Sequence, residues 1–299
     1  MQGKRVLVVG YGKLGWRVAH TLSEKHEVIA LKRSSIEHVG KVNMCFADVT
    51  RIESLKGSLP LCMKDGIDYL IYCLSPSERS EQGYREAYLT GLQNVIAELP
   101  HRETLQHIIF ISSTSVYHQA NGEEVNELSL CKPSGFSGKV LLEAESYISG
   151  LNIASTAVRF SGIYGGYRSR LIDQVKHALE AGEVLEAAPG YTNRIHEDDC
   201  LGFICHLIDL LAKNETLETC YVATDSCPVE QANVYSYIAQ QLQKVLKNKK
   251  LQLIVSEQAK SLRRAGSKRC KNDRMKQSAY VLKYASYKEG YLEALKDNE

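Results

Sequence analysis

Residues 4–15 read Lys4-Arg-Val-Leu-Val-Val-Gly10-Tyr-Gly12-Lys-Leu-Gly15, a short apolar run that leads directly into three closely spaced glycines. The run is rich in β-branched residues and lacks polar alternation, which is typical of a parallel strand buried on both faces. Residues 14–25 place apolar side chains at helical spacing. The stretch therefore predicts a strand, a tight turn and a helix in succession.

The same alternation of strand and helix recurs along the chain. Buried strands are predicted at residues 27–31, 42–46, 68–73, 107–111 and 153–160, and helices at 84–99 and 139–149. Strands that alternate with helices imply right-handed crossovers and a doubly wound parallel sheet of the α/β class. Later segments predict helices at about 169–181, 197–212 and 229–245, and strands at 219–223 and 251–255. Residues 256–280 are polar and basic and predict no element.

The glycine turn matches the Gly-x-Gly-x-x-Gly pattern of dinucleotide-binding proteins in its strand-to-helix context. Gly10 would permit the tight turn, Gly12 would let the backbone approach a pyrophosphate, and Gly15 would let the helix pack closely on the strand. The helix start would offer free N–H groups and a positive dipole end to the phosphates. The predicted cofactor contacts in this turn are Gly10, Tyr11, Gly12, Lys13, Leu14 and Gly15.

The end of the second predicted strand bears on the choice of cofactor. NAD-binding proteins usually place an acidic residue there to bond the ribose hydroxyls. This chain instead has Lys32, Arg33 and Ser34, which suit a 2′-phosphate. These residues favour NADP, and NAD remains the alternative.

Composition describes an ordinary globular chain. It has 299 residues, of which 44% are apolar and 24% are charged. No apolar run approaches the roughly 18 residues that cross a bilayer, and the N-terminus does not read as a secretory signal. The nine cysteines form no Cys-x-x-Cys pair, so we expect reduced thiols, no metal site and a cytoplasmic protein. We expect a nucleotide-binding domain over residues 1–165, with returns to the sheet near 190–225, and a smaller, partly interleaved cap over 166–299.

Charge is unevenly distributed along the chain. Net charge is +2, but residues 241–299 contain 15 Lys and Arg against 6 Asp and Glu. A basic segment could contact nucleic acid. We favour a solvated helical face, because the basic residues are scattered and no DNA-binding motif accompanies them.

Five further motifs occur in a family's order. They are Ala47-Asp48-Val49-Thr50, Tyr72-Cys-Leu74-Ser75-Pro76, Phe110-Ile-Ser-Ser-Thr-Ser-Val-Tyr117, Arg159-Phe-Ser-Gly-Ile-Tyr-Gly-Gly-Tyr-Arg168 and Asn193-Arg-Ile-His-Glu-Asp-Asp199. With the glycine turn, the chain resembles the extended short-chain dehydrogenase/reductases, the NAD(P)-dependent epimerase/dehydratase family, over nearly its whole length. The resemblance implies a Rossmann-type fold. It also implies cofactor contacts at Asp48, Val49, Leu74 and Ser75.

The family's catalytic pattern is broken in this chain. Relatives use a Ser or Thr with a Tyr-x-x-x-Lys pair, in which the ammonium stabilises a phenolate that moves the substrate proton. The resemblance assigns Ser113 and Lys139 to the first and last of these roles, and Lys139 also to the nicotinamide ribose. Gly135 stands four residues before Lys139, where the family has tyrosine. The chain therefore resembles an atypical member that lacks the catalytic tyrosine.

Three interpretations of the missing phenol remain open. Another group could move the proton, with Tyr164 the first candidate and His118 the second, although either residue could simply be structural. The chain could instead bind NADP(H) without turnover, as a sensor or regulatory module. In a third interpretation the basic C-terminal segment binds nucleic acid, and the dinucleotide-binding domain regulates that binding.

The resemblance also implies how a substrate is held. Arg168, Arg170 and Arg194 lie in segments where relatives hold the phosphates of nucleotide sugars, a task that suits guanidinium groups. Arg194 could equally pair with Asp198 or Asp199. The expected activity is an NADP-dependent oxidoreductase or epimerase reaction on a carbonyl or nucleotide-sugar-like substrate. Family members often form homodimers through the helices near 84–99 and 139–149, so the resemblance allows a homodimer here.

Overall fold

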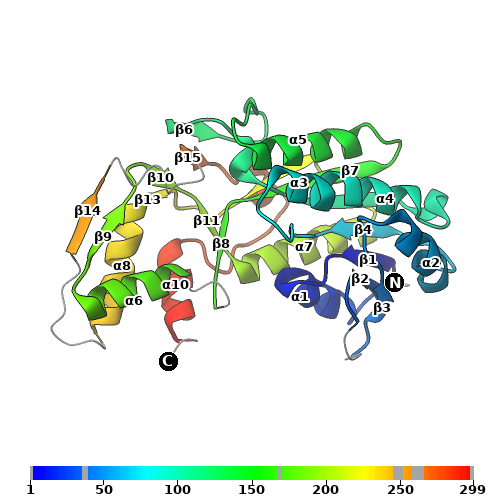
Figure 1. Cartoon of the computed structure of the whole chain (residues 1–299), viewed down its shortest axis with the longest axis horizontal. Coiled ribbons are helices and arrows are strands. Elements are labelled where there is room, and N and C mark those ends of the chain that lie inside the picture. The colour runs from blue at the N-terminus through cyan, green and yellow to red at the C-terminus, as the bar shows by residue number, and fades with distance from the viewer. Residues whose placement is uncertain (1–2, 36–39, 167–169, 245–251, 257–265, 297–299) are drawn as a thin grey trace. The chain divides into compact units, whose positions relative to one another are not determined.

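The computed structural model describes residues 3–35, 40–166, 170–244, 252–256 and 266–296 (Figure 1). Residue contacts divide the chain into two compact units. Unit 1 comprises Met1–Val116, Cys131–Arg159 and Leu201–Tyr221, and unit 2 comprises Tyr117–Leu130, Phe160–Cys200 and Val222–Glu299. Each unit is thus assembled from segments that are distant in sequence.

A seven-stranded sheet organises unit 1, in the order β12-β7-β5-β4-β1-β2-β3. The strands are β1 (Arg5–Val9), β2 (Glu27–Lys32), β3 (Asn43–Phe46), β4 (Tyr69–Tyr72), β5 (His107–Ser113), β7 (Ala154–Phe160) and β12 (Cys220–Ala223). Neighbouring strands from β3 to β5 pair in parallel. Strand order reverses direction at β1, which is the switch point where such sheets bind ligands. The predicted doubly wound α/β sheet is confirmed.

Helices cover both faces of this sheet. They are α1 (Lys13–Leu22), α2 (Ile52–Cys62), α3 (Glu81–Tyr84), the π-helix η1 (Arg85–Thr90), α4 (Gly91–Ala97), α5 (Phe136–Ser149) and α7 (Glu197–Ala212), with 3-10 turns η2 (Arg102–Thr104) and η3 (Thr114–Val116). Figure 1 shows α3, α4 and α5 on one face and α1 and α7 on the other. The Lys25–Asp209 ion pair, 3.0 Å long, links the segment after α1 to α7. Because both faces are covered, the central strands are almost entirely apolar.

The described residues of unit 2 form short paired strands and four helices that lie wholly within it. The strands pair as β6 (Asn121–Val125) with β15 (Ser267–Cys270), β8 (Gly162–Tyr164) with β11 (Arg194–His196), β9 (Val184–Ala187) with β14 (Gln252–Val255), and β10 (Tyr191–Thr192) with β13 (Val229–Glu230). The helices are α6 (Arg170–Ala181), α8 (Gln231–Gln243), α9 (Asp273–Gln277) and α10 (Tyr287–Lys296). Side chains of α6, α8 and α10 form one buried apolar cluster.

The strands of the central sheet are predicted more accurately than the other elements. Every predicted strand of the first 160 residues is present within one to two residues of its expected bounds. Helix α2 was not predicted, and α5 begins three residues earlier than expected. Strands β6 and β15 were also missed, although β15 supplies an element for the unassigned stretch 256–280. Within the described residues, no helix has the length and apolar content to cross a membrane.

Candidate functional site

Packing contacts within the protein explain why two of the three positions in the turn after β1 are glycines. Gly10 has a φ of +99°, and a Cβ there would lie 2.7 Å from the backbone oxygen of Cys73. A Cβ on Gly15 would collide with the backbone oxygen of Gly10. The lack of a side chain at Gly15 therefore lets α1 approach the turn closely, and the lack of one at Gly10 allows its positive φ and the close approach of the segment after β4.

Gly12 has no such explanation within the chain. Its φ is −78°, which any residue adopts. An added Cβ would meet no atom within 4 Å. Gly12 caps α1 without a side chain, and no acidic residue occupies the first turn of the helix. The missing side chain keeps the approach to the N-terminus of α1 uncrowded, as a dinucleotide pyrophosphate requires.

Tyr11 contributes to the turn mainly through its backbone. Its ring is buried, and its hydroxyl lies 2.8 Å from Nε2 of His20 on α1. Burial raises the pKa of the Tyr11 phenol. The Tyr11 side chain therefore stabilises the turn by its contact with α1.

The end of β2 presents basic side chains. Lys32 is half-buried and its carbonyl oxygen accepts a 3.0 Å hydrogen bond from the Ala47 N–H. Arg33 and Ser34 are exposed. Neither Lys32 nor Arg33 pairs with a carboxylate among the described residues, so both are available to an anionic ligand.

The loops after β3 and β4 hold the other predicted cofactor contacts. Oδ1 of Asp48 accepts hydrogen bonds from the N–H and the hydroxyl of Thr50, at 3.0 and 2.7 Å. Val49 is buried and its carbonyl oxygen accepts from Nδ2 of Asn94. Leu74 is half-buried and Ser75 is exposed after β4. Strand β4 pairs directly with β1, and β3 pairs with β2 on the other side of β1. Because these strands are parallel, the loops that follow them lie at the same edge of the sheet as the glycine turn.

Ser113 and Lys139 lie on neighbouring elements of unit 1. Ser113 ends β5, and its Oγ accepts a 3.2 Å hydrogen bond from the Ser115 N–H. Lys139 is exposed in the first turn of α5, which packs on β5. Gly135 is the N-cap residue of that helix, and a Cβ there would meet only Oγ of Ser137, at 4.0 Å. The helix thus begins beside an open position.

A buried ion pair fixes α5 against the sheet. Nη2 of Arg159 on β7 lies 2.6 Å from Oε2 of Glu145 on α5, and both side chains are about nine-tenths buried. The Ser112 hydroxyl on β5 donates to Oε1 of Glu145 at 2.5 Å. Glu145 therefore joins α5, β5 and β7. The sequence analysis missed this cluster, because a single carboxylate on a helix gives no signal of its partners.

Tyr164 lies in the apolar core of unit 2. Its ring stacks on Tyr291 at 4.5 Å and meets His196 edge-on at 5.2 Å. Its hydroxyl lies against Gly290 of α10, where a Cβ would collide with it. Burial is the main cause that raises the pKa of this phenol. Tyr164 is therefore a packing residue and a poor proton carrier, whereas His118 is exposed after Tyr117.

The three predicted substrate arginines have different surroundings. Arg194 is buried, bonds Oγ1 of Thr192 and lies 3.4 Å from the hydroxyl of Tyr291. Its carboxylate neighbour is Asp225, instead of the expected Asp198 or Asp199. Arg170 is exposed at the start of α6. Arg168 lies outside the described residues.

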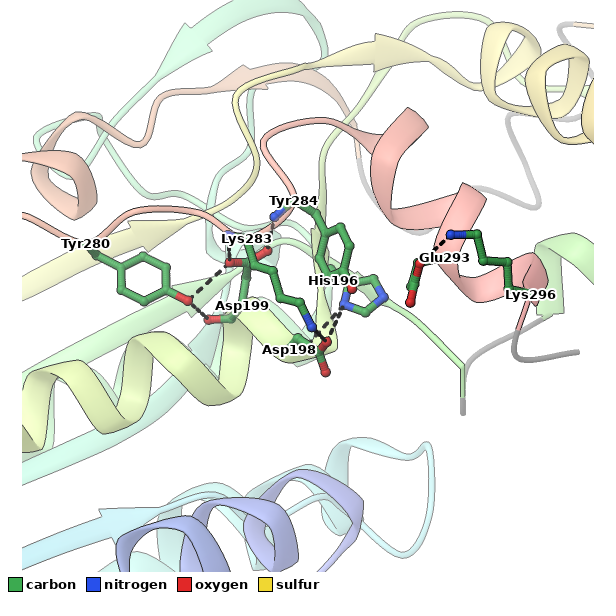
Figure 2. Close-up of polar contacts among 8 residues, drawn as sticks. All are labelled: His196, Asp198, Asp199, Tyr280, Lys283, Tyr284, Glu293 and Lys296. Atoms are coloured by element: carbon green, nitrogen blue, oxygen red, sulfur yellow. Dashed lines mark hydrogen bonds and ion pairs between the residues drawn. The ribbon is translucent and has the colours of Figure 1, made fainter. Parts of the chain in front are cut away.

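The motif at residues 193–199 binds the C-terminal segment of unit 2. The Asp199 carboxylate accepts hydrogen bonds from the N–H groups of Lys283 and Tyr284, at 2.7 and 3.0 Å, and from the Tyr280 hydroxyl at 3.1 Å (Figure 2). Nζ of Lys283 lies 2.7 Å from Asp198. Asp199 thus holds the C-terminal segment of unit 2 in place through hydrogen bonds. Its partners lie about 85 residues later in the chain and could not be predicted from the motif.

Asp225 is a buried carboxyl with one open oxygen. Oδ1 accepts a 3.0 Å hydrogen bond from the Cys227 N–H, and Oδ2 has no hydrogen-bond partner in the described part of the chain. Burial raises the pKa of Asp225 to about 7, partly opposed by the N–H bond and by the Arg194 guanidinium. The folded chain therefore keeps this proton up to about pH 7, whereas the unfolded chain loses it near pH 4.

Asp225 should make the chain less stable as pH rises from about 4 to 7, since the folded state binds more protons in that window. The Asp225→Asn variant should lose this slope and be more stable than the wild type at pH 8, by up to about 4 kcal/mol. Urea unfolding of both proteins at pH 5 and pH 8 measures the difference. Equal losses of stability in the two proteins would show that Asp225 is ionised throughout.

Fold and site together define a dinucleotide-binding α/β protein. Neither protein-family models nor curated proteins give a match to this chain. Among solved structures, the chain is 32% identical to a Methylobacillus flagellatus protein described as an NAD-dependent epimerase/dehydratase, with a TM-score of 0.78 and 98% of each chain covered. This likeness shows that the chain belongs to the NAD-dependent epimerase/dehydratase family.

Two more distant structures share the fold. The Bordetella bronchiseptica enzyme WbmG in complex with NAD and UDP is 12% identical, with a TM-score of 0.75 over 99% of this chain and 94% of that one. The UDP-N-acetylglucosamine 4-epimerase from Bacillus cereus is 17% identical, with a TM-score of 0.73 over 99% and 100%. The predicted resemblance to extended short-chain dehydrogenase/reductases is thus confirmed at the level of the family. No group of three or more potential metal ligands occurs in the described residues.

Proposed function

We propose that this chain is an NAD(P)-dependent enzyme of the epimerase/dehydratase type, with its cofactor in the glycine turn of unit 1. The observation that carries the proposal is Gly12, because neither its φ nor its packing requires a glycine. A bound pyrophosphate accounts for the missing side chain. Family membership and the NAD in the related WbmG structure support the same cofactor class.

Within this class we propose NADP as the preferred dinucleotide. Lys32 and Arg33 are unpaired among the described residues and stand where an NAD-binding protein would carry an acid. Two cations and the Ser34 hydroxyl would bond a 2′-phosphate, with charge-assisted bonds worth roughly 1.5–3 kcal/mol each.

Replacing Arg33 by alanine should therefore weaken NADP binding by about tenfold or more and leave NAD binding nearly unchanged. Calorimetric titration with each dinucleotide measures both affinities, and Arg51→Ala, an exposed arginine of the α2 N-terminus, serves as the control. An equal loss for the two dinucleotides, or tighter NAD binding by the wild type, would refute the preference.

The bound nicotinamide would supply a hydride acceptor or donor. The chain's own part is to hold the substrate oxygen and manage its proton. In this proposal the Ser113 hydroxyl orients the substrate oxygen, and the Lys139 ammonium holds the nicotinamide ribose and stabilises negative charge near that oxygen. Gly135 departs from the family pattern, so the phenol of the usual Tyr-x-x-x-Lys pair is missing from its expected place.

We propose a nucleotide sugar as the substrate class. The related structures that contain UDP or act on UDP-N-acetylglucosamine support this class. Arg170 and Arg168 are the arginines of this chain that we assign to the diphosphate, since Arg194 is enclosed in unit 2. A guanidinium suits that task because it binds two phosphate oxygens at once.

Incubation with UDP-N-acetylglucosamine and either dinucleotide tests the activity. We expect reduced cofactor at 340 nm or a UDP-sugar epimer by chromatography, and neither product with Lys139→Met. Tight dinucleotide binding without turnover across a panel of nucleotide sugars would instead support the alternative function, a silent NADP(H) sensor, which the absent phenol favours.

A further inference from the structure

The position that the family tyrosine would fill is uncrowded. Gly135 and Lys139 are four residues apart and share one stripe of α5. Phe136, Val140 and Glu143 form the adjoining stripe at i, i+4 and i+7. A Cβ on Gly135 would meet only Oγ of Ser137 within 4 Å. A phenol that reaches this stripe from another element thus has room beside Lys139.

Two consecutive residues of the long helix α3–η1–α4 contact α5 along this face. The Tyr84 ring meets the Phe136 ring edge-on at 5.4 Å. The Arg85 guanidinium binds both carboxylate oxygens of Glu143 at 2.8 Å. Because Phe136 and Glu143 bracket Lys139 along the helix, Tyr84 is held next to the stripe that carries the lysine.

A series of aromatic contacts, the aromatic ladder, links Tyr84 through Tyr88 to Phe110 of the central sheet. Tyr84 packs against Tyr88 at 5.4 Å, and Tyr88 meets Phe110 edge-on at 6.3 Å. Phe110 lies on β5, three residues before Ser113. The π-helix η1, which begins directly after Tyr84, is the kind of helix insertion often found at functional sites. Tyr84 is thus fixed between the elements that hold Ser113 and Lys139.

The Tyr84 hydroxyl is available for chemistry. The ring is only partly buried, and the hydroxyl has no hydrogen-bond partner among the described residues. Tyr72 on β4 differs because it is fully buried. Its hydroxyl donates a 2.5 Å hydrogen bond to the Ala87 carbonyl oxygen. Tyr164 is also enclosed. Among the phenols considered, only Tyr84 combines an open hydroxyl with a contact to the start of α5.

We propose that Tyr84 supplies the phenol that Gly135 lacks, acting as the proton-transfer residue beside Lys139. This inference rests on the proposed function. In the oxidative direction Tyr84, as the phenolate, would accept the substrate O–H proton as the C–O bond becomes a carbonyl, and a bound oxidised dinucleotide would supply the acceptor for the hydride of the C–H bond. In the reductive direction the Tyr84 phenol would return the proton to the oxygen, and a bound reduced dinucleotide would supply the hydride to carbon.

The first test needs no known substrate. The full chain is treated with tetranitromethane with and without saturating NADP, and nitrated tyrosines are identified by peptide mass spectrometry. NADP should protect Tyr84, and it should leave Tyr147 at the far end of α5 unchanged. Failure of both NADP and NAD to bind in calorimetry would overturn the proposed function. Binding without protection of Tyr84 would overturn only the present inference.

The second test compares matched variants in the UDP-N-acetylglucosamine assay. Tyr84→Phe should lower the rate by about 100-fold or more with NADP affinity unchanged, whereas Tyr88→Phe, in the same ladder, should keep both. Adding Gly135→Tyr to Tyr84→Phe should restore turnover, since this position has room for a side chain. A wild-type rate in Tyr84→Phe would contradict the assignment, and so would failure of the double variant to recover.

Discussion

Replacing Gly15 by alanine should destabilise unit 1 by about 3 kcal/mol or more, which lowers the unfolding midpoint by roughly 10 °C. The new methyl group would occupy the place of the Gly10 carbonyl oxygen. Neither partner can yield easily, because Gly10 is itself held by a 3.1 Å hydrogen bond from its N–H to the Leu31 oxygen. Helix α1 must therefore move away from β1. Thermal unfolding followed by circular dichroism measures the effect.

Gly12→Ala is the matched control for this prediction. Its Cβ would meet no protein atom within 4 Å, so the unfolding midpoint should stay within about 1 °C of the wild type. Dinucleotide affinity should nevertheless fall, because the methyl group stands where the pyrophosphate approaches. A midpoint that drops equally in both variants would contradict the distinct roles assigned to Gly12 and Gly15.

Breaking the buried ion pair between Glu145 and Arg159 should lower the stability of unit 1 by an amount similar to that of Gly15→Ala. Arg159→Met leaves the Glu145 carboxylate buried without its partner, and such a loss costs about 3–5 kcal/mol. Because Glu145 also accepts from Ser112, the packing of α5 on β5 should loosen and dinucleotide affinity should fall as well. Urea unfolding and calorimetry measure the two effects.

Two further variants separate charge from packing. Arg85→Met breaks an ion pair of similar length with Glu143, but its side chains are 38% and 43% exposed, so stability should hardly change. The double variant Arg159→Met/Glu145→Leu should regain most of the stability that Arg159→Met loses, because no unpaired charge remains. If the double variant were as unstable as the single one, packing and not charge would explain the loss.

The sheet and the glycine turn were predictable because their signals are local. Apolar β-branched runs identify buried strands, and three glycines between a strand and a helix indicate a cofactor turn without any knowledge of distant residues. The contacts of Asp199 with residues 280–284 were not predictable, since nothing in a short motif encodes its partner. The same holds for the Ser112–Glu145–Arg159 cluster.

The catalytic assignments were the least predictable part. Tyr164 was selected because its motif resembles a stretch that passes the nicotinamide in relatives, yet its phenol faces Gly290 in an apolar core. Tyr84 gave no signal, because it reaches the face of α5 through a helix that precedes that face by about 50 residues. Side-chain direction and packing, which decide such roles, are absent from a motif.

The account's central claim is that the turn from Gly10 to Gly15 holds a pyridine dinucleotide, and calorimetric titration of the purified chain with NADP and NAD tests it most directly. We expect one dinucleotide bound per chain, with NADP the tighter, and a marked loss of affinity in the stably folded Gly12→Ala variant. Absence of binding by the folded wild-type chain, or full affinity in Gly12→Ala, would contradict the claim.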